Sequence, residues 1–408
     1  MNTSIRVKKT QFKHLNGASF PLVVIDNQLD MISASYLLQR YNNGLSLKTL
    51  DREARAIRKL YAFFIDKKID IVTRLAKLDR LQIGEIESLH AYLATHLDTF
   101  ELVSQATFKH YFSTSQRFIE FLFNFYQSRV TDPKKLQASR IALEGMKKGF
   151  EINKRSPHNG KTKERIGLSP ELQVLFFAAI DPNEENILNP FKSQKTRWRN
   201  YCLLLTLILG GNRKGETLGL RIRDFQLTGN EAAEKYFEIV KRDRTFDGYP
   251  RKEIPSVKTK GRKVSLSPEL VEIFEYYITK IRPKFKDANK NEYLFLSNRD
   301  GQPLHPITPN HIVGELIKVH PKFKGKLTPH ILRNTFHDIL NTSLDDQFKD
   351  MGPMRKQQIK NTMQEYAGGW SAGSAMVAHY PKGSIQARVA ELQSRIQSNI
   401  LSEETIDV

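Results

Sequence analysis

The feature that most restricts how this chain can fold is the apolar segment 201–209, which only Thr206 interrupts. A helix that is apolar around its whole circumference has to be buried inside a domain. The segment ends at Gly210-Gly211, a common way to end a helix, and Arg213 follows closely. The sequence therefore predicts a globular domain built around this helix, with Arg213 held rigidly beside it and a new helix over 216–220.

A second segment, 328–336, predicts a helix that begins with two polar side chains on one face. Thr328 can cap the helix, and Pro329 fits the first helical position, where its missing N–H costs nothing. His330 and Arg333 lie three residues apart, so they share a face beside the positive end of the helix dipole. This is a candidate anion site, and Phe336 is expected to anchor the helix to a core. The alternative is an ordinary helix start with two solvated polar residues.

The charge of the chain indicates a polyanionic partner. Its 408 residues include 64 Lys and Arg against 44 Asp and Glu, giving a net charge of +20 and a pI near 9.7. Nucleic acid is the first candidate, and a merely basic soluble protein is the alternative. The single cysteine, Cys202, excludes an intramolecular disulfide and a cysteine cluster for zinc. With no apolar secretory signal at the start, we expect a reducing cytoplasm.

The region 46–150 predicts a small helical domain with basic outer faces. One helix has a single apolar stripe at spacings of four, three, four and three residues, formed by Leu50, Ala54, Ile57, Tyr61 and Phe64. Further helices are expected over 83–97 and 108–129. The latter is dense in aromatic residues, which are expected to form core rather than stacking platforms for bases.

The second half mixes helices with short strands. Ser-Pro-Glu at 169–171 and again at 267–269 predicts two helix starts. Strands are expected over 236–240 and 293–296, and 254–257 with 263–266 would form a hairpin across a Gly-containing turn. An amphipathic helix is expected from Ser384 onward.

The polar segments together resemble one enzyme family. Gly-x-Arg-x-x-Glu-x-Leu-x-Leu occupies 211–220, and His-x-x-Arg lies within His-Ile-Leu-Arg-Asn-Thr-Phe at 330–336. Leu218-Gly-Leu220 is followed by Asp224, and Leu294-Phe295 precedes a turn with Gly and Pro. In this order, over about 165–382, the segments resemble the tyrosine recombinase, or phage integrase, family.

The resemblance implies a fold that is mainly α with a small antiparallel β-sheet. A helical SAM-like core-binding domain would precede a tyrosine recombinase catalytic domain that breaks and rejoins DNA. The predicted division is an N-terminal arm over 1–45, a core-binding DNA-binding domain over 46–150, a basic linker over 151–165, a catalytic domain over 166–383, and a C-terminal helix and tail over 384–408 lying between subunits.

The resemblance also implies roles for individual residues. Arg213 and Arg333 would neutralise the charge that develops on the phosphate, since guanidinium groups are planar, bidentate and permanently charged. His330 would donate to the phosphate or relay a proton. Tyr380 would be the nucleophile that forms a covalent phosphotyrosine bond, whereas Tyr366 is expected to be structural.

The remaining positions come from the same resemblance. A hairpin lysine would be the general acid for the leaving oxygen, with Lys258 as first choice and Lys260 as second. Trp370 fills a His/Trp position, where its indole N–H can bond a phosphate oxygen, and Glu216 would orient its neighbours. The interval from Arg333 to Trp370 is longer than usual in the family, which predicts an inserted helix around 354–363.

The implied protein is a site-specific recombinase or integrase that acts on double-stranded DNA as a homotetramer, for integration or excision of a mobile element. We expect no metal or nucleotide cofactor, and a bacterial cytoplasmic, nucleoid-associated location. One alternative is a type IB topoisomerase or hairpin-forming resolvase, and another is a non-catalytic DNA-binding regulator on the same scaffold. An RNA-processing ligase or nuclease would need acidic metal ligands, and we find no such cluster in the sequence.

Overall fold

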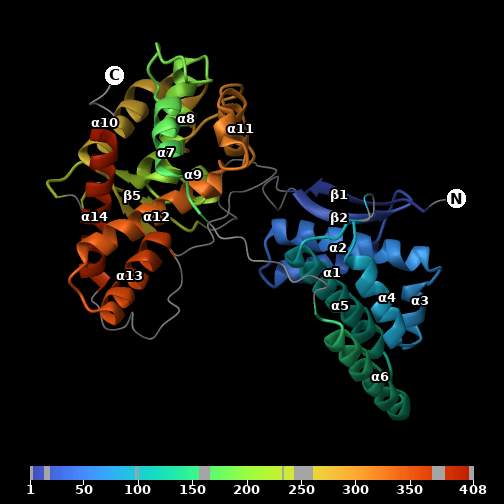
Figure 1. Cartoon of the computed structure of the whole chain (residues 1–408). Coiled ribbons are helices and arrows are strands. Elements are labelled where there is room, and N and C mark those ends of the chain that lie inside the picture. The colour runs from blue at the N-terminus through green and yellow to red at the C-terminus, as the bar shows by residue number, and fades with distance from the viewer. Residues whose placement is uncertain are drawn as a thin grey trace. The chain divides into compact units, whose positions relative to one another are not determined.

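The computed structural model describes residues 3–12, 19–96, 99, 101–155, 166–231, 234–242, 261–369 and 382–403, with the backbone alone for 382–388 and 403. These residues divide into two compact units, one formed by residues up to 155 and one by residues from 166 on (Figure 1). The predicted fold class is confirmed, since both units are mainly helical and each contains a small antiparallel sheet.

The first unit combines a three-stranded sheet with six helices. Its elements are β1 (Ile5–Gln11), β2 (Ser19–Ile25), β3 (Gln28–Leu29), α1 (Met31–Asn42), α2 (Leu47–Asp66), α3 (Ile71–Ala76), α4 (Ile83–Leu93), α5 (Gln105–Gln127) and α6 (Pro133–Ile152). The strand order is β1-β2-β3, with Val7 opposite Val23. Because β2 contributes Phe20 and Val23 to the core around α2, residues predicted as an arm are part of a folded sheet.

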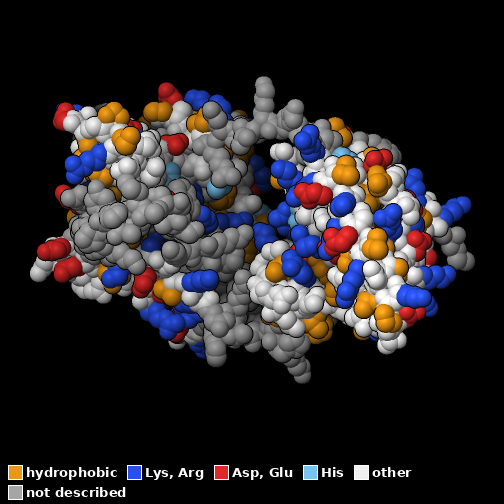
Figure 2. Space-filling model, turned by 90° about the horizontal axis from the view of Figure 1, so that it is seen from below, with side chains coloured by type: hydrophobic (Ala, Val, Ile, Leu, Met, Phe, Trp, Pro, Cys, Tyr) orange, Lys and Arg blue, Asp and Glu red, His pale blue; other side chains and the backbone are white. Residues whose placement is uncertain are grey.

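Periodic apolar residues explain the core of this unit. The predicted stripe of α2 is buried along its length, from Leu50 to Phe64. On α5, Phe108, Phe118 and Phe123 are fully buried, so the expectation of core rather than base-stacking residues is confirmed for them. The surface is basic: Figure 2 shows many Lys and Arg side chains, with fewer Asp and Glu, on one face of this unit.

The second unit surrounds a buried helix and a second small sheet. Its elements are α7 (Pro170–Ile180), α8 (Gln194–Ile208), α9 (Lys214–Gly219), β4 (Phe225–Gln226), β5 (Tyr236–Ile239), β6 (Arg262–Ser265), α10 (Pro268–Tyr276), α11 (Thr308–Val319), α12 (Pro329–Gln347), α13 (Pro353–Gly368) and α14 (Lys382–Glu403). The antiparallel order is β4-β5-β6, with Phe237 opposite Val264.

The predicted central helix is confirmed as α8, which is buried on all sides from Tyr201 onward. Its only polar residue in that segment, Thr206, donates to the carbonyl of Leu203 over 2.7 Å and shares a 3.0 Å hydroxyl contact with Thr217 of α9. A buried hydroxyl with partners on both sides costs little. Thr206 therefore ties the central helix to the short helix that follows Arg213.

Helix α12 packs beside α8. It also contacts the first described residues of the second unit. The backbone N–H of Gly167 donates to the Asp338 carboxylate over 2.7 Å, and that of Leu168 donates to the Thr335 hydroxyl over 2.8 Å. A Cβ on Gly167 would come within 2.6 Å of the Thr335 Cα. This close approach fixes the first residues of the unit against α12.

The prediction of a strand over 293–296 is wrong. Only single bridges occur at its ends, between Arg221 and Tyr293 and between Leu296 and Pro303. Side chains bind several of the carbonyl groups that a neighbouring strand would otherwise bind. Arg282 donates to the Tyr293 carbonyl, Tyr277 to that of Leu294 and Arg199 to that of Leu296, each over 3.1 Å. The backbone is satisfied without a ladder.

Two other helix predictions have different outcomes. The inserted helix around 354–363 is confirmed as α13, which begins at Pro353. Helix α14 packs through Val389, Leu392 and Ile396 against the core of its own unit, whereas its predicted place between subunits stays a prediction. The predicted strand 254–257 and linker residues 156–165 lie outside the described residues. No helix in the described part of the chain is both long and apolar enough to cross a membrane.

Candidate functional site

The start of α12 has the capped geometry that the sequence predicts. The Thr328 hydroxyl accepts a hydrogen bond from the Ile331 N–H over 3.1 Å, and Pro329 takes the first helical position. His330 is exposed in the first turn, while Arg333, almost a full turn further, is buried. The helix therefore carries one polar group at the surface and one inside the unit.

Gly211 allows α12 to approach the end of α8. Its φ of +61° is a left-handed conformation that favours glycine, and a Cβ there would overlap the ring of Phe336. The Gly211 carbonyl accepts a hydrogen bond from Nη1 of Arg333. Phe336 also belongs to the core formed with α13 and α14, which confirms its predicted anchoring role.

Arg213 and Glu216 are joined twice at the start of α9. The Arg213 backbone N–H donates to Oε2 of Glu216 over 2.9 Å, and its Nη1 donates to Oε1 over 3.2 Å. The Glu216 carboxylate is fully buried, whereas 31% of the Arg213 side chain is exposed. Glu216 thus has the expected contacts of a residue that orients its neighbour.

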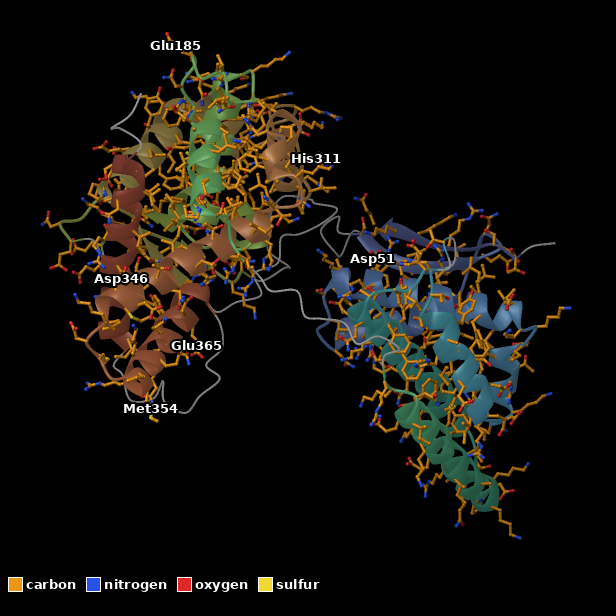
Figure 3. The ribbon with its side chains drawn as sticks, in the orientation of Figure 1. Asp51, Glu185, His311, Asp346, Met354 and Glu365 are labelled. Atoms are coloured by element: carbon orange, nitrogen blue, oxygen red, sulfur yellow. The ribbon has the colours of Figure 1, made fainter. Side chains whose placement is uncertain are left out.

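The two arginines predicted to share a site do meet. Nη2 of Arg333 donates to the Gly368 carbonyl over 2.9 Å, and Nη1 of Arg213 donates to the same oxygen over 3.3 Å. Gly368 is the last residue of α13, the helix on which Figure 3 labels Met354 and Glu365. The inserted helix therefore supplies an acceptor on which both guanidinium groups converge.

Sequence reasoning missed a third guanidinium group, that of Arg262. Its Nη2 lies 3.1 Å from Oε2 of Glu216 and 3.4 Å from Oδ1 of Asn212. Strand alternation could have found it, because Arg262 is two residues before the buried Val264 and so shares its face of β6.

A fourth residue, His337, was missed as well. It follows Arg333 by four residues on α12, and its Nδ1 lies 2.7 Å from Oε1 of Gln364. Burial and the nearby charge of Arg333 lower the pKa of His337 to about 4, so the ring is neutral at physiological pH. The i, i+4 spacing that places it beside Arg333 was the available signal.

The electrostatics of the site favour an anionic ligand. Three guanidinium groups surround one carboxylate, since Nη1 of Arg333 also lies 3.7 Å from Oε2 of Glu216. Burial lowers the pKa of Arg333 to about 9, and the charge of Arg213 acts in the same direction. An anion placed here would relieve the repulsion among the cations.

Four of the predicted site residues, Lys258, Lys260, Trp370 and Tyr380, lie outside the described residues, and their roles stay predictions. In the described ranges, no three His, Cys, Asp or Glu side chains are grouped closely enough to hold a metal ion. The described residues that meet at the site are thus Arg213, Glu216, Arg262 and Arg333, with His337 four residues beyond Arg333 on α12 and His330 exposed at the start of that helix.

The chain was compared with known proteins in three ways. Residues 180–348 match the model of the phage integrase family. Among solved structures, the chain is similar to the XerH site-specific recombinase bound to its difH substrate in a pre-cleavage complex, with 20% sequence identity and a TM-score of 0.34. That match covers 76% of this chain and 84% of the other. The search of curated proteins finds no match.

Proposed function

The chain belongs to the phage integrase family of tyrosine recombinases through residues 180–348, and on this premise we propose that it recombines DNA at specific sites through a covalent 3′-phosphotyrosyl intermediate. The observation that carries the proposal is the convergence of Arg213 and Arg333 on one oxygen, the Gly368 carbonyl. Two guanidinium groups that reach one oxygen atom can also reach the non-bridging oxygens of one phosphate.

The reaction needs three things from the protein: an attacking oxygen, neutralisation of the charge on the pentacoordinate phosphorus, and a proton for the leaving oxygen. In our proposal the Tyr380 oxygen attacks phosphorus, and the bond to the 5′-oxygen breaks. Lys258, or Lys260 in its place, gives that oxygen its proton. The reverse attack by a 5′-hydroxyl restores the phosphodiester and releases Tyr380.

Arg213 and Arg333 would stabilise the charge that develops on the pentacoordinate phosphorus in the transition state of each step. Preorganised donors of this kind usually contribute the largest single term, about 10²–10³-fold in rate for each donor. His330, which is exposed at the start of α12, would donate to the phosphate or take the tyrosine proton, and the Trp370 N–H would bond a phosphate oxygen. Glu216 would hold Arg213 through its two contacts.

The partner we propose is double-stranded DNA with a specific recombination site. A net charge of +20 and the basic face of the first unit favour binding to a phosphate backbone. We further propose a homotetramer on DNA, a bacterial cytoplasmic and nucleoid-associated location, and integration or excision of a mobile element as the biological role.

A covalent trapping experiment tests this function. The full chain is incubated with duplex fragments that tile the DNA around its own gene, and SDS-resistant protein–DNA adducts are isolated and their ends sequenced. We expect adducts at one repeated sequence, lost in Tyr380→Phe although that variant still binds DNA. Tyr366→Phe is the matched control and should form adducts. Adducts formed equally by Tyr380→Phe would show that Tyr380 is not the nucleophile, and DNA binding without adducts in the wild type would favour the non-catalytic regulator.

A further inference from the structure

Arg262 is almost completely buried beside the site. Only 2% of its side chain is exposed, against 31% for Arg213. Its Nη2 contacts Glu216 and Asn212, whereas its Nε and Nη1 are buried without a hydrogen-bond partner among the described residues. A buried guanidinium group needs a compensating negative charge, and Glu216 is the only carboxylate with which an ion pair of Arg262 is recorded in the described ranges.

Glu216 is shared between three cations, and the geometry shows how it is divided. Oε2 lies 3.1 Å from Nη2 of Arg262 and 3.7 Å from Nη1 of Arg333, while Oε1 faces Arg213 at 3.2 Å. Of these two guanidinium groups, Arg262 is therefore the nearer to Oε2. If that group were absent, the full charge of Glu216 would act on Arg213 and Arg333 and weaken their attraction for an anion.

We infer that Arg262 is a positioning residue of this site: its guanidinium group offsets the charge of Glu216, which leaves Arg213 and Arg333 with an uncompensated positive charge for a phosphate group. The inference rests on the proposed function for the identity of that phosphate, a DNA phosphodiester. Glu216 can then orient Arg213 through hydrogen bonds without cancelling its charge.

Charge balance gives a test that a purely structural role would not pass. Arg262→Met removes the offsetting charge, so affinity for inorganic phosphate should fall about tenfold or more. Adding Glu216→Gln removes the excess negative charge while keeping an acceptor for the Arg213 N–H. The double variant Arg262→Met/Glu216→Gln should therefore recover phosphate affinity to within about threefold of wild type, and Arg262→Lys should retain most of it.

The measurement is the shift of the thermal midpoint with inorganic phosphate, against chloride at equal ionic strength, for the full chain. Arg199→Met is the matched control, because Arg199 is equally buried but donates to the Leu296 carbonyl and the Asn200 side chain. It should lower the midpoint and leave the phosphate response unchanged.

The outcomes separate this inference from the proposed function. Recovery in the double variant supports it, whether or not the wild type forms a DNA adduct. An Arg262→Met variant with wild-type phosphate affinity, a double variant as weak as the single one, or a wild type without a phosphate response would each overturn it. Adduct formation by the wild type tests the proposed function alone.

Discussion

Gly211 lies so close to Phe336 that a side chain at position 211 would overlap the phenyl ring. The contact joins the end of the buried helix α8 to the middle of α12. The Gly211 carbonyl also accepts a hydrogen bond from Arg333, which lies about one turn before Phe336 on α12. The placement of Arg333, and of Arg213 two residues after Gly211, thus depends on a position that has no side chain.

The first prediction concerns this contact. Gly211→Ala should lower the free energy of unfolding by about 2–4 kcal/mol, since the left-handed backbone and the overlap with Phe336 both oppose a methyl group. Chemical denaturation measures the change. Gly314→Ala in α11 is the control: nothing lies within 4 Å of its added Cβ, and stability should rise by up to about 1 kcal/mol. Equal effects of the two substitutions would contradict the close approach.

The second prediction concerns Arg333. Lysine keeps the charge but lacks the planar fork whose Nη1 and Nη2 donate to the Gly211 and Gly368 carbonyls. Arg333→Lys should slow adduct formation by about 10²–10³-fold, measured in single-turnover trapping with the site found above. The exposed Arg299→Lys should react at the wild-type rate, and an unimpaired Arg333→Lys would remove this residue from the proposed mechanism.

The third prediction is a pH dependence of stability from His337. Its pKa is about 4 in the folded chain and about 6.5 when unfolded, so the unfolded state binds the proton first as the pH falls. The free energy of unfolding should therefore decrease as the pH falls from ~6.5 to ~4, and this loss of stability from His337 amounts to roughly 3 kcal/mol.

Denaturation curves between pH 4 and 7 provide the measurement for His337. His337→Gln removes the titrating group at this position, so the stability of the variant should fall less steeply with decreasing pH than that of the wild type over this window. Parallel pH profiles for the two proteins would show that another group is responsible.

The fourth prediction concerns the docking of α14 on its own unit. Gln397 is buried; it accepts from the Ser267 N–H over 2.8 Å and donates to the Ser265 carbonyl over 3.0 Å. Gln397→Leu leaves these backbone groups unpaired and should destabilise the chain by about 2–4 kcal/mol. The exposed Asn399→Leu on the same helix should change stability little, and an unaffected Gln397→Leu would mean that α14 is not docked this way in solution.

Local signals made much of this site predictable. The cap at Thr328 and the apolar segment of α8 from Tyr201 onward depend on residues close together in sequence, and the structure has both. To predict that Arg262 lies in the site, one must know which face of β6 is buried. The strand expected over 293–296 is absent because its backbone pairs with neighbouring segments only at single bridges, and side chains such as that of Arg282 bind several of its carbonyl groups. Such long-range pairings leave no local pattern in the sequence.

The Gly368 carbonyl has one more consequence. Because the guanidinium groups of Arg213 and Arg333 already point at a backbone oxygen, their rotamers are selected before any ligand arrives. A phosphate that replaces this oxygen would therefore freeze few additional torsions, and the entropic cost of its capture is largely met during folding.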